Sequence, residues 1–205
     1  MAFQPCTDIA KISLNGTLFG EEYVNTLYAT HPPDTPWTVA ELEALADGVF
    51  AEWSSNPGAF TSGFSFDSVT CTDLSDITGP QGNSSASPVA GTDGGTANAN
   101  NVAWTIKFLT GNIGRSFRGR NQIGGYTHNQ MDDANHVKLS YALSMIDVYN
   151  AIKTAIETAG GAMCVLSRRA DNAQRPVGIG TLVTSIAFTD LISDSQRTRL
   201  PARGA

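Results

Sequence analysis

The chain has 205 residues, of which 41% are hydrophobic and 16% charged, and this is enough apolar sequence for one core in a single domain. Its formal net charge of −6 argues against nonspecific binding of nucleic acid by the whole surface, because the net field repels phosphate. No apolar run approaches the roughly 18–20 residues of a membrane span, and the N-terminus lacks the features of a signal peptide. We therefore expect a soluble protein with no membrane partner, made in a cytoplasm.

The charge is divided unevenly along the chain. Residues 1–106 carry one lysine and twelve acidic residues, whereas residues 107–205 carry twelve basic and seven acidic residues. This difference predicts a two-faced molecule that either stacks with copies of itself, positive against negative, or turns one face to a polyanion. Within one structural domain we distinguish an acidic part (1–78), a low-complexity arm (79–101) and a basic part (102–205).

The acidic part begins with two stretches of alternating apolar and polar residues, 11–18 and 22–30, which predict an antiparallel hairpin around Phe19-Gly20-Glu21. A helix is expected from about Pro36 to Trp53, because its apolar residues recur at helical spacing. Pro36 suits its first turn, and Thr38 with Glu41 fits a capping box. Apolar and polar residues alternate again at 64–74, which predicts a further strand.

The arm, 79–101, consists of Gly, Ser, Asn, Thr and Pro with almost no bulky side chains. Such a segment cannot build a core, so we expect either a mobile surface loop or an extended arm that is ordered only by a neighbouring molecule. The next residues, 101–110, read as a strand with Trp104, Ile106 and Phe108 on one face.

The basic part opens with a glycine-rich stretch, 111–125, in which three arginines surround an aromatic ring: Arg115, Arg118 and Arg120 around Phe117. Guanidinium groups beside an aromatic suit phosphate contact and base stacking, and they suit carboxylates equally well. The opposed charges slightly favour salt bridges, within or between subunits, over nucleic-acid contact and over a solvated loop.

A second helix is expected from about Ala134 to Ala159, with Gly160-Gly161 as its stop. Ahead of it stand the only clustered residues of metal-ligand type, His128, Asp132, Asp133 and His136. Acidic residues at a helix start are favoured by the helix dipole, so capping of the first turn is the preferred interpretation and no metal is expected.

The rest of the basic part is expected to form a strand at 162–167, a polar hairpin loop at 168–177 and a strand at 180–190. The loop contributes Arg168, Arg169 and Arg175 as candidates for subunit or nucleic-acid contact. The Arg-rich end, with Arg197, Arg199 and Arg203, is a free tail, a subunit tie or a nucleic-acid contact.

Nothing in the sequence indicates a cofactor or catalysis. Cys6, Cys71 and Cys164 are too few and too far apart for a disulfide scaffold, so they are expected to be free buried thiols. Ser195 has no Gly-x-Ser-x-Gly context, and the carboxylates show no recognisable acid and base pair. We do not expect an enzyme.

Three sets of segments stand out: the string from Asn101 to Arg120, Ser167-Arg168 with Arg175-Pro176-Val177-Gly178, and Asp194-Ser195-Gln196-Arg197 with Arg199-Leu200-Pro201 and Arg203-Gly204. Together they resemble a family of small structural proteins from uncultured viruses and phages. The resemblance covers most of the chain. It implies a component of the virion and leaves coat, tail and connector roles open. Related chains have Arg after Gln196-Arg197, whereas this chain has Thr198, so its tail lacks a continuous basic run.

These observations predict an α+β fold in which antiparallel strands pack with two helices and carry the long Gly/Ser/Asn-rich arm. The expected function is that of a self-assembling capsid or coat subunit, located in the virion and made in the host cytoplasm. Its partners would be many copies of itself and the viral genome, RNA or DNA. The alternatives are a phage tail or connector protein and a nucleic-acid-binding module.

Overall fold

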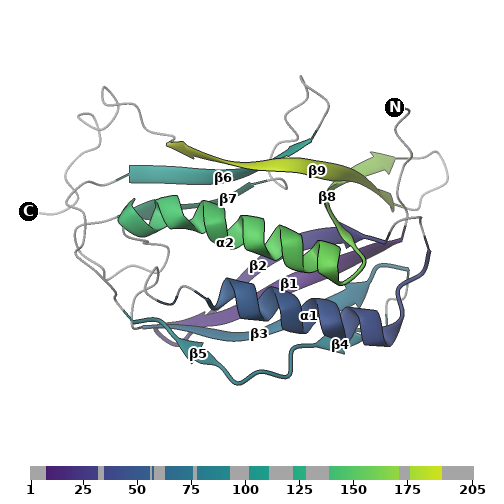
Figure 1. The fold of residues 1–205 in the computed structure, drawn as a ribbon, viewed down its shortest axis with the longest axis horizontal. Helices are drawn as coiled ribbons and strands as arrows, with labels where there is room; N and C mark the ends of the chain where they lie inside the picture. Colours follow the sequence, from purple (N-terminus) through teal and green to yellow (C-terminus); the bar gives the residue numbers. More distant parts are fainter. Residues whose placement is uncertain are drawn as a thin grey trace, which may run out of the picture.

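The computed structural model describes residues 8–31, 35–55, 57, 63–75, 78–92, 102–110, 122–127, 139–170 and 176–190. For 102–110, 122–127, 139–146, 165–170, 176–181 and 184–190 it describes the backbone alone. Within these residues the chain forms an antiparallel β-sheet with two α-helices, as expected for an α+β protein (Figure 1).

The described strands form one antiparallel sheet in the order β4-β3-β1-β2-β8-β9-β6-β7, and β5 also pairs with β3. The elements in chain order are β1 (Ile9–Leu18), β2 (Glu21–Thr30), α1 (Val39–Trp53), β3 (Phe64–Asp73), β4 (Gly82–Asn83), β5 (Val89–Ala90), β6 (Val102–Thr110), β7 (Gln122–Thr127), α2 (Leu139–Thr158), β8 (Ala162–Ala170) and β9 (Pro176–Asp190).

The two halves of the sheet repeat one strand order. In the first half, the hairpin β1-β2 is followed by α1, and β3 then pairs with β1; in the second half, the hairpin β6-β7 is followed by α2 and β8, and β9 pairs with β6. The orders β3-β1-β2 and β9-β6-β7 are therefore equivalent, and β8 joins them at the centre.

Helix α1 begins at the predicted capping box but later than predicted. Thr38 is the N-cap residue: its Oγ1 accepts a hydrogen bond from the backbone N–H of Glu41, and the Glu41 carboxylate accepts one from the backbone N–H of Thr38 at 2.8 Å. The cap fixes the start of the helix at Val39. Pro36 therefore precedes the cap, and the prediction that it occupies the first turn is wrong.

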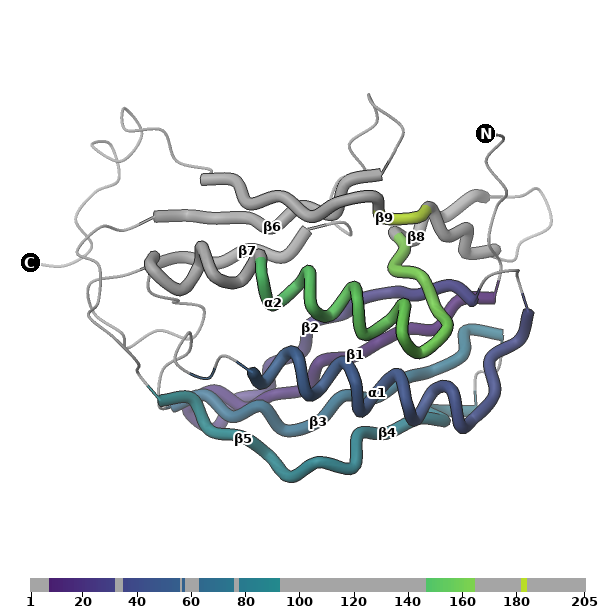
Figure 2. Tube along the Cα trace, in the orientation of Figure 1, coloured from purple at the N-terminus to yellow at the C-terminus, as the bar shows by residue number. Residues whose placement is uncertain are grey.

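The core lies between one face of the sheet and the two helices (Figure 2). Alternate residues of β1 enter it, including Ala10, Ile12 and Leu14, all with 0% exposure. On α1, Trp53 is 1% exposed and its ring meets that of Phe66 edge-on, with 4.8 Å between the centroids. The apolar face of α2 completes the core with Val148, Tyr149, Ile152 and Ile156.

Much of the predicted arm packs on its own chain. Residues 78–92 run along the outer edge of β3: the backbone N–H of Ser84 donates to the Val69 carbonyl at 2.9 Å, and the N–H of Gly91 donates to the Phe64 carbonyl at 2.7 Å. Gly82 fits against α1, where an added Cβ would lie 2.7 Å from Leu42 Cβ. The expectation of a segment ordered only by a neighbour, or not at all, is therefore wrong for 79–92, whereas 93–101 lies outside the described residues.

The basic half differs from prediction at several boundaries. β6 confirms the strand expected at 101–110, but β7 occupies 122–127, where a glycine-rich stretch had been expected to continue. The strands β8 and β9 are longer than predicted, so that Arg168 and Arg169 lie in β8 opposite Gly178 and Val177 rather than in a hairpin loop. Backbone hydrogen bonding along the ladder overrides the polar character of these residues.

Helix α2 covers much of the predicted second helix but begins at Leu139. The predicted start near Ala134 and the metal-type residues before it lie outside the described residues.

Candidate interaction surface

None of the ten arginine and phenylalanine positions predicted as contact residues has a described side chain. Arg168 and Arg169 are placed by their backbone alone, in β8. The others lie outside the described residues: Arg115, Phe117, Arg118, Arg120, Arg175, Arg197, Arg199 and Arg203. The basic surface thus remains a sequence prediction, and the structure gives the acidic one.

The described side chains are strongly acidic. They include eleven Asp and Glu residues but only two lysines, Lys11 and Lys153, a formal charge of −9. Since the whole chain carries −6, the residues without described side chains carry +3. A net charge of this size attracts cationic groups and repels phosphate.

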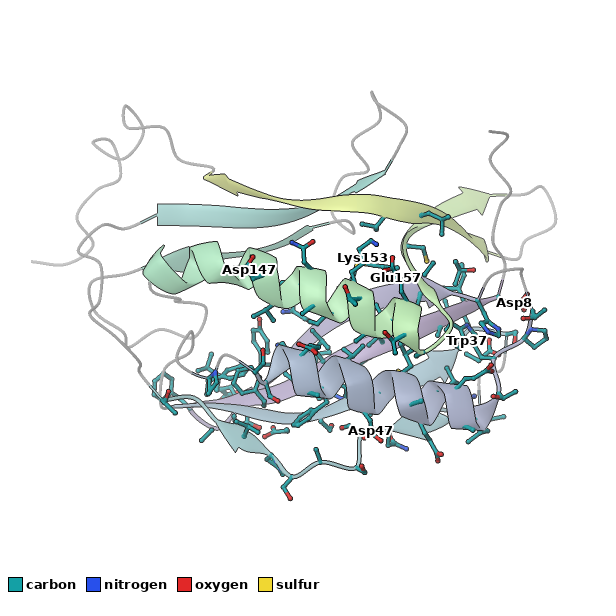
Figure 3. All side chains as sticks on the ribbon, in the orientation of Figure 1. Asp8, Trp37, Asp47, Asp147, Lys153 and Glu157 are labelled. Carbon is teal, nitrogen blue, oxygen red and sulfur yellow. The ribbon has the colours of Figure 1, made fainter. Side chains whose placement is uncertain are left out.

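The two helices form the most acidic layer of the described part. Six carboxylates stand on them against the single lysine Lys153: Glu41, Glu43, Asp47, Glu52, Asp147 and Glu157. Three have partners: Glu41 caps α1, Glu157 pairs with Lys153, and Asp47, on the side of α1 away from α2, accepts hydrogen bonds from Ser85 (Figure 3). Glu43, Glu52 and Asp147 have no polar partner among the described residues.

A groove runs between α1 and α2 on the side away from the sheet. The helices approach closely at Gly48, where an added Cβ would lie 3.6 Å from Ala155 Cβ. Beside this contact the surface is hollowed by about 520 Å³, and Glu52 is the one charged group lining it. We call this the helix groove; its lining residues are Ala44, Gly48, Ala51 and Glu52 of α1 and Ala151, Thr154, Ala155, Thr158 and Ala159 of α2.

The opposite face of the sheet is covered by neither helix (Figure 1), and along the middle of β1 and β3 it carries a set of polar side chains. Asn15 Nδ2 donates to Ser68 Oγ and to Thr70 Oγ1, each at 3.3 Å, and Thr17 Oγ1 donates to Asp67. These bonds join β1 to β3 side by side. A surface of paired hydroxyl, amide and carboxylate groups has little free donor capacity for phosphate, so it does not favour nucleic acid.

One cysteine and two tyrosines, Cys71, Tyr23 and Tyr149, have raised pKa values. Burial raises the pKa of Cys71 to about 12 and that of Tyr23 to about 12, and it raises the pKa of Tyr149 well above 10. Tyr23 OH, at the border of the core, accepts a 2.6 Å hydrogen bond from Asn25 Nδ2. At neutral pH these groups therefore act in packing, and the charged chemistry of the described part is that of its exposed carboxylates.

Three comparisons with known proteins give no relative. No family model matches the chain, no curated protein matches it, and no solved structure matches it. Neither described helix is long and apolar enough to cross a membrane. Among the described residues, no group of three His, Cys, Asp or Glu side chains is placed to hold a metal ion.

Sequence reasoning missed the helix groove. Its signal was present as small residues at helical spacing, at positions 44, 48 and 51 and again at 151 and 155. Small residues on an exposed helix face carry no functional signature alone, and only the approach of the two helices makes them the walls of one groove.

Proposed function

We propose that the chain is a structural protein of a virus, a coat-type subunit that assembles with many copies of itself into the virion. The observation that carries the proposal is the division of charge along the chain: residues 1–106 carry one basic and twelve acidic residues, whereas residues 107–205 carry twelve basic and seven acidic residues. A heterologous contact that repeats from copy to copy brings such complementary surfaces together at every interface.

The covered edge of β3 supports assembly through side-chain surfaces. An exposed edge strand pairs readily with a strand of another molecule. Here β4 and β5 occupy that edge, and the carbonyl groups of Val69 and Cys71 already accept hydrogen bonds from Ser84 and Gln81. Copies are therefore expected to meet through charged and apolar side chains, as in a shell or tube, and not by addition of strands at β3.

Contact with the genome is a further part of the proposal and rests on the arginines of the basic part. The described sheet face carries Lys11 but also Glu22 and Asp67, and the helix layer is acidic. We therefore propose the Arg cluster at 115–120 for genome contact, because guanidinium groups are the donors that suit phosphate.

Negative-stain electron microscopy of the purified protein at low and high salt tests the proposal, with absorbance at 260 and 280 nm recorded on the same sample. We expect regular particles far larger than one 21.6 kDa chain at low salt and fewer at high salt, because salt screens the charge contacts. A ring of a few copies would instead indicate the connector role. A monomer at both salt concentrations would refute self-assembly.

A further inference from the structure

We propose that the helix groove is the docking site for the basic C-terminal segment, residues 197–203, of a second copy of the chain. This inference rests on the proposed self-assembly and names one of its contacts. The groove combines apolar walls with one carboxylate, Glu52, that has no described partner.

Glu52 defines the chemistry of the occupant. Glu52 is partly exposed, and its neighbours along the groove are Ala, Gly and Thr residues that supply no charge. A carboxylate in such a place is stabilised by a cation that brings its own hydrogen-bond donors. The only lysine on the helices, Lys153, is paired with Glu157 and does not line the groove. The missing partner is therefore a basic side chain from elsewhere.

Arginine matches the rest of the groove better than a compact cation does. Its aliphatic stem can lie along apolar walls such as Ala51 and Ala155 while its planar guanidinium reaches the carboxylate of Glu52. The groove is open along its length, so the outward backbone groups of an occupant can keep their hydrogen bonds to water while its side chains contact the walls.

The sequence Arg197-Thr-Arg-Leu-Pro-Ala-Arg203 has these properties. It carries three arginines and no acidic residue. Pro201 has no backbone N–H to satisfy and disfavours helix at Leu200, so this stretch favours the extended conformation that peptides adopt in grooves. From Ala44 to Ala51 the α1 wall is about 10 Å long at 1.5 Å per residue, which matches about three extended residues at 3.3 Å each.

The competing Arg cluster, Arg115 to Arg120, is the weaker occupant. It holds Phe117 between its arginines, and the aromatic ring is bulky for walls set by the close approach of Gly48 and Ala155. A second copy, rather than the same chain, is favoured because one acidic groove and one basic segment per copy generate a repeating head-to-tail contact.

Disulfide trapping between two different variants tests the contact directly. Both carry Cys6→Ser; one also carries Ala51→Cys, and the other carries Leu200→Cys and a small affinity tag. When the two variants are mixed and mildly oxidised, one tagged chain and one untagged chain should join in a disulfide-linked dimer of about twice 21.6 kDa. Ala40→Cys is the matched control, since Ala40 is exposed on the same helix and does not line the groove. Cys71 and Cys164 are buried and do not compete.

A charge reversal supplies the second test. Glu52→Arg should raise the concentration at which particles form at least tenfold, whereas Glu43→Arg, an equal reversal at an exposed position outside the groove, should change it less than threefold. Glu52 lies near the C-terminal end of α1, where a cation suits the helix dipole, so the variant should keep its melting temperature.

The outcomes separate this contact from the proposed function. Particles that form normally with Glu52→Arg, or mixed dimers that form equally with Ala40→Cys, would overturn the groove contact and leave self-assembly intact. Absence of particles in the unaltered protein would refute self-assembly itself. Mixed dimers confined to Ala51→Cys, together with the tenfold effect, would establish the contact.

Discussion

Replacing Gly82 by Ala should loosen the strand that covers the edge of β3. The added methyl group would lie 2.7 Å from Leu42 Cβ and closer still to the Leu42 carbonyl, which belongs to the rigid backbone of α1. β4 must therefore shift or detach. Overpacking of this kind costs about 1–3 kcal/mol.

The hydrogen bonds between residues 81–84 and β3 account for the rest of the expected loss in the free energy of unfolding. The N–H of Gln81 donates to the Cys71 carbonyl at 3.0 Å, and the N–H of Asp73 donates to Gln81 Oε1 at 2.9 Å. The N–H of Val69 donates to Ser84 Oγ at 2.9 Å. Each bond contributes about 1 kcal/mol, and a shift of β4 weakens some of them. We expect Gly82→Ala to lower the free energy of unfolding by about 2–4 kcal/mol.

Urea unfolding followed by the fluorescence of buried Trp37 and Trp53 measures this loss, and amide hydrogen exchange at Val69 and Asp73 locates it. Gly48→Ala is the contrasting variant: its methyl group would meet Ala155 at an ordinary 3.6 Å, so helix propensity should make it stabilising by about 0.5–1 kcal/mol. The packing argument fails if both variants change stability equally, or if exchange at Val69 and Asp73 stays slow in Gly82→Ala.

Three further predictions concern the core and the titratable groups. Trp53→Ala should destabilise by about 3–5 kcal/mol in urea unfolding, because the ring is 1% exposed and packs on Phe66; exposed Val39→Ala is the control, and similar losses in both would contradict the assigned core. Thr38→Ala should cost about 1 kcal/mol at pH 7 and less at pH 3. Hydrogen bonds from Thr38 lower the pKa of Glu41 from 4.5, so this stabilisation is present above pH 4.5 and is lost as the pH falls through the lowered pKa; equal losses at both pH values would refute the linkage. In a Cys6→Ser, Cys164→Ser variant, Cys71 should resist a thiol reagent at pH 8 until urea is added, since burial raises its pKa to about 12; labelling of the folded protein at the unfolded rate would show that the thiol is accessible.

The sequence predicted the elements whose signals are local. Alternation located the β1-β2 hairpin and β3, and the pair Thr38 and Glu41 located the cap of α1, because a capping box uses only residues three apart. The start of the helix was placed too early because proline is compatible with the first turn, and only the cap geometry decides where that turn is.

Contacts distant in sequence could not be predicted in the same way. The segment around Gly82 reads as featureless, yet it is ordered by the carbonyl groups of β3 and by the space beside Leu42, both contributed by other elements. Likewise, the continuation of β8 through Arg168 and Arg169 depends on its pairing with β9. The acidic half of the charge division is present in the described surface, whereas the basic contact residues stay a prediction.

Residues 78–92, which pair with the edge of β3, are synthesised after the strand that they protect. The ribosome releases β1, β2, α1 and β3 before residues 78–92, so the edge of β3 and the surface of α1 beside Leu42 are bare while the chain is still growing. Until residues 78–92 have been made, a nascent chain exposes the edge of β3 to other nascent chains on the same messenger RNA. Fragments that end at residue 92 should therefore aggregate less than fragments that end near residue 75, and the aggregation that remains should come from the edge of β2 and the core face that β8 and α2 cover later.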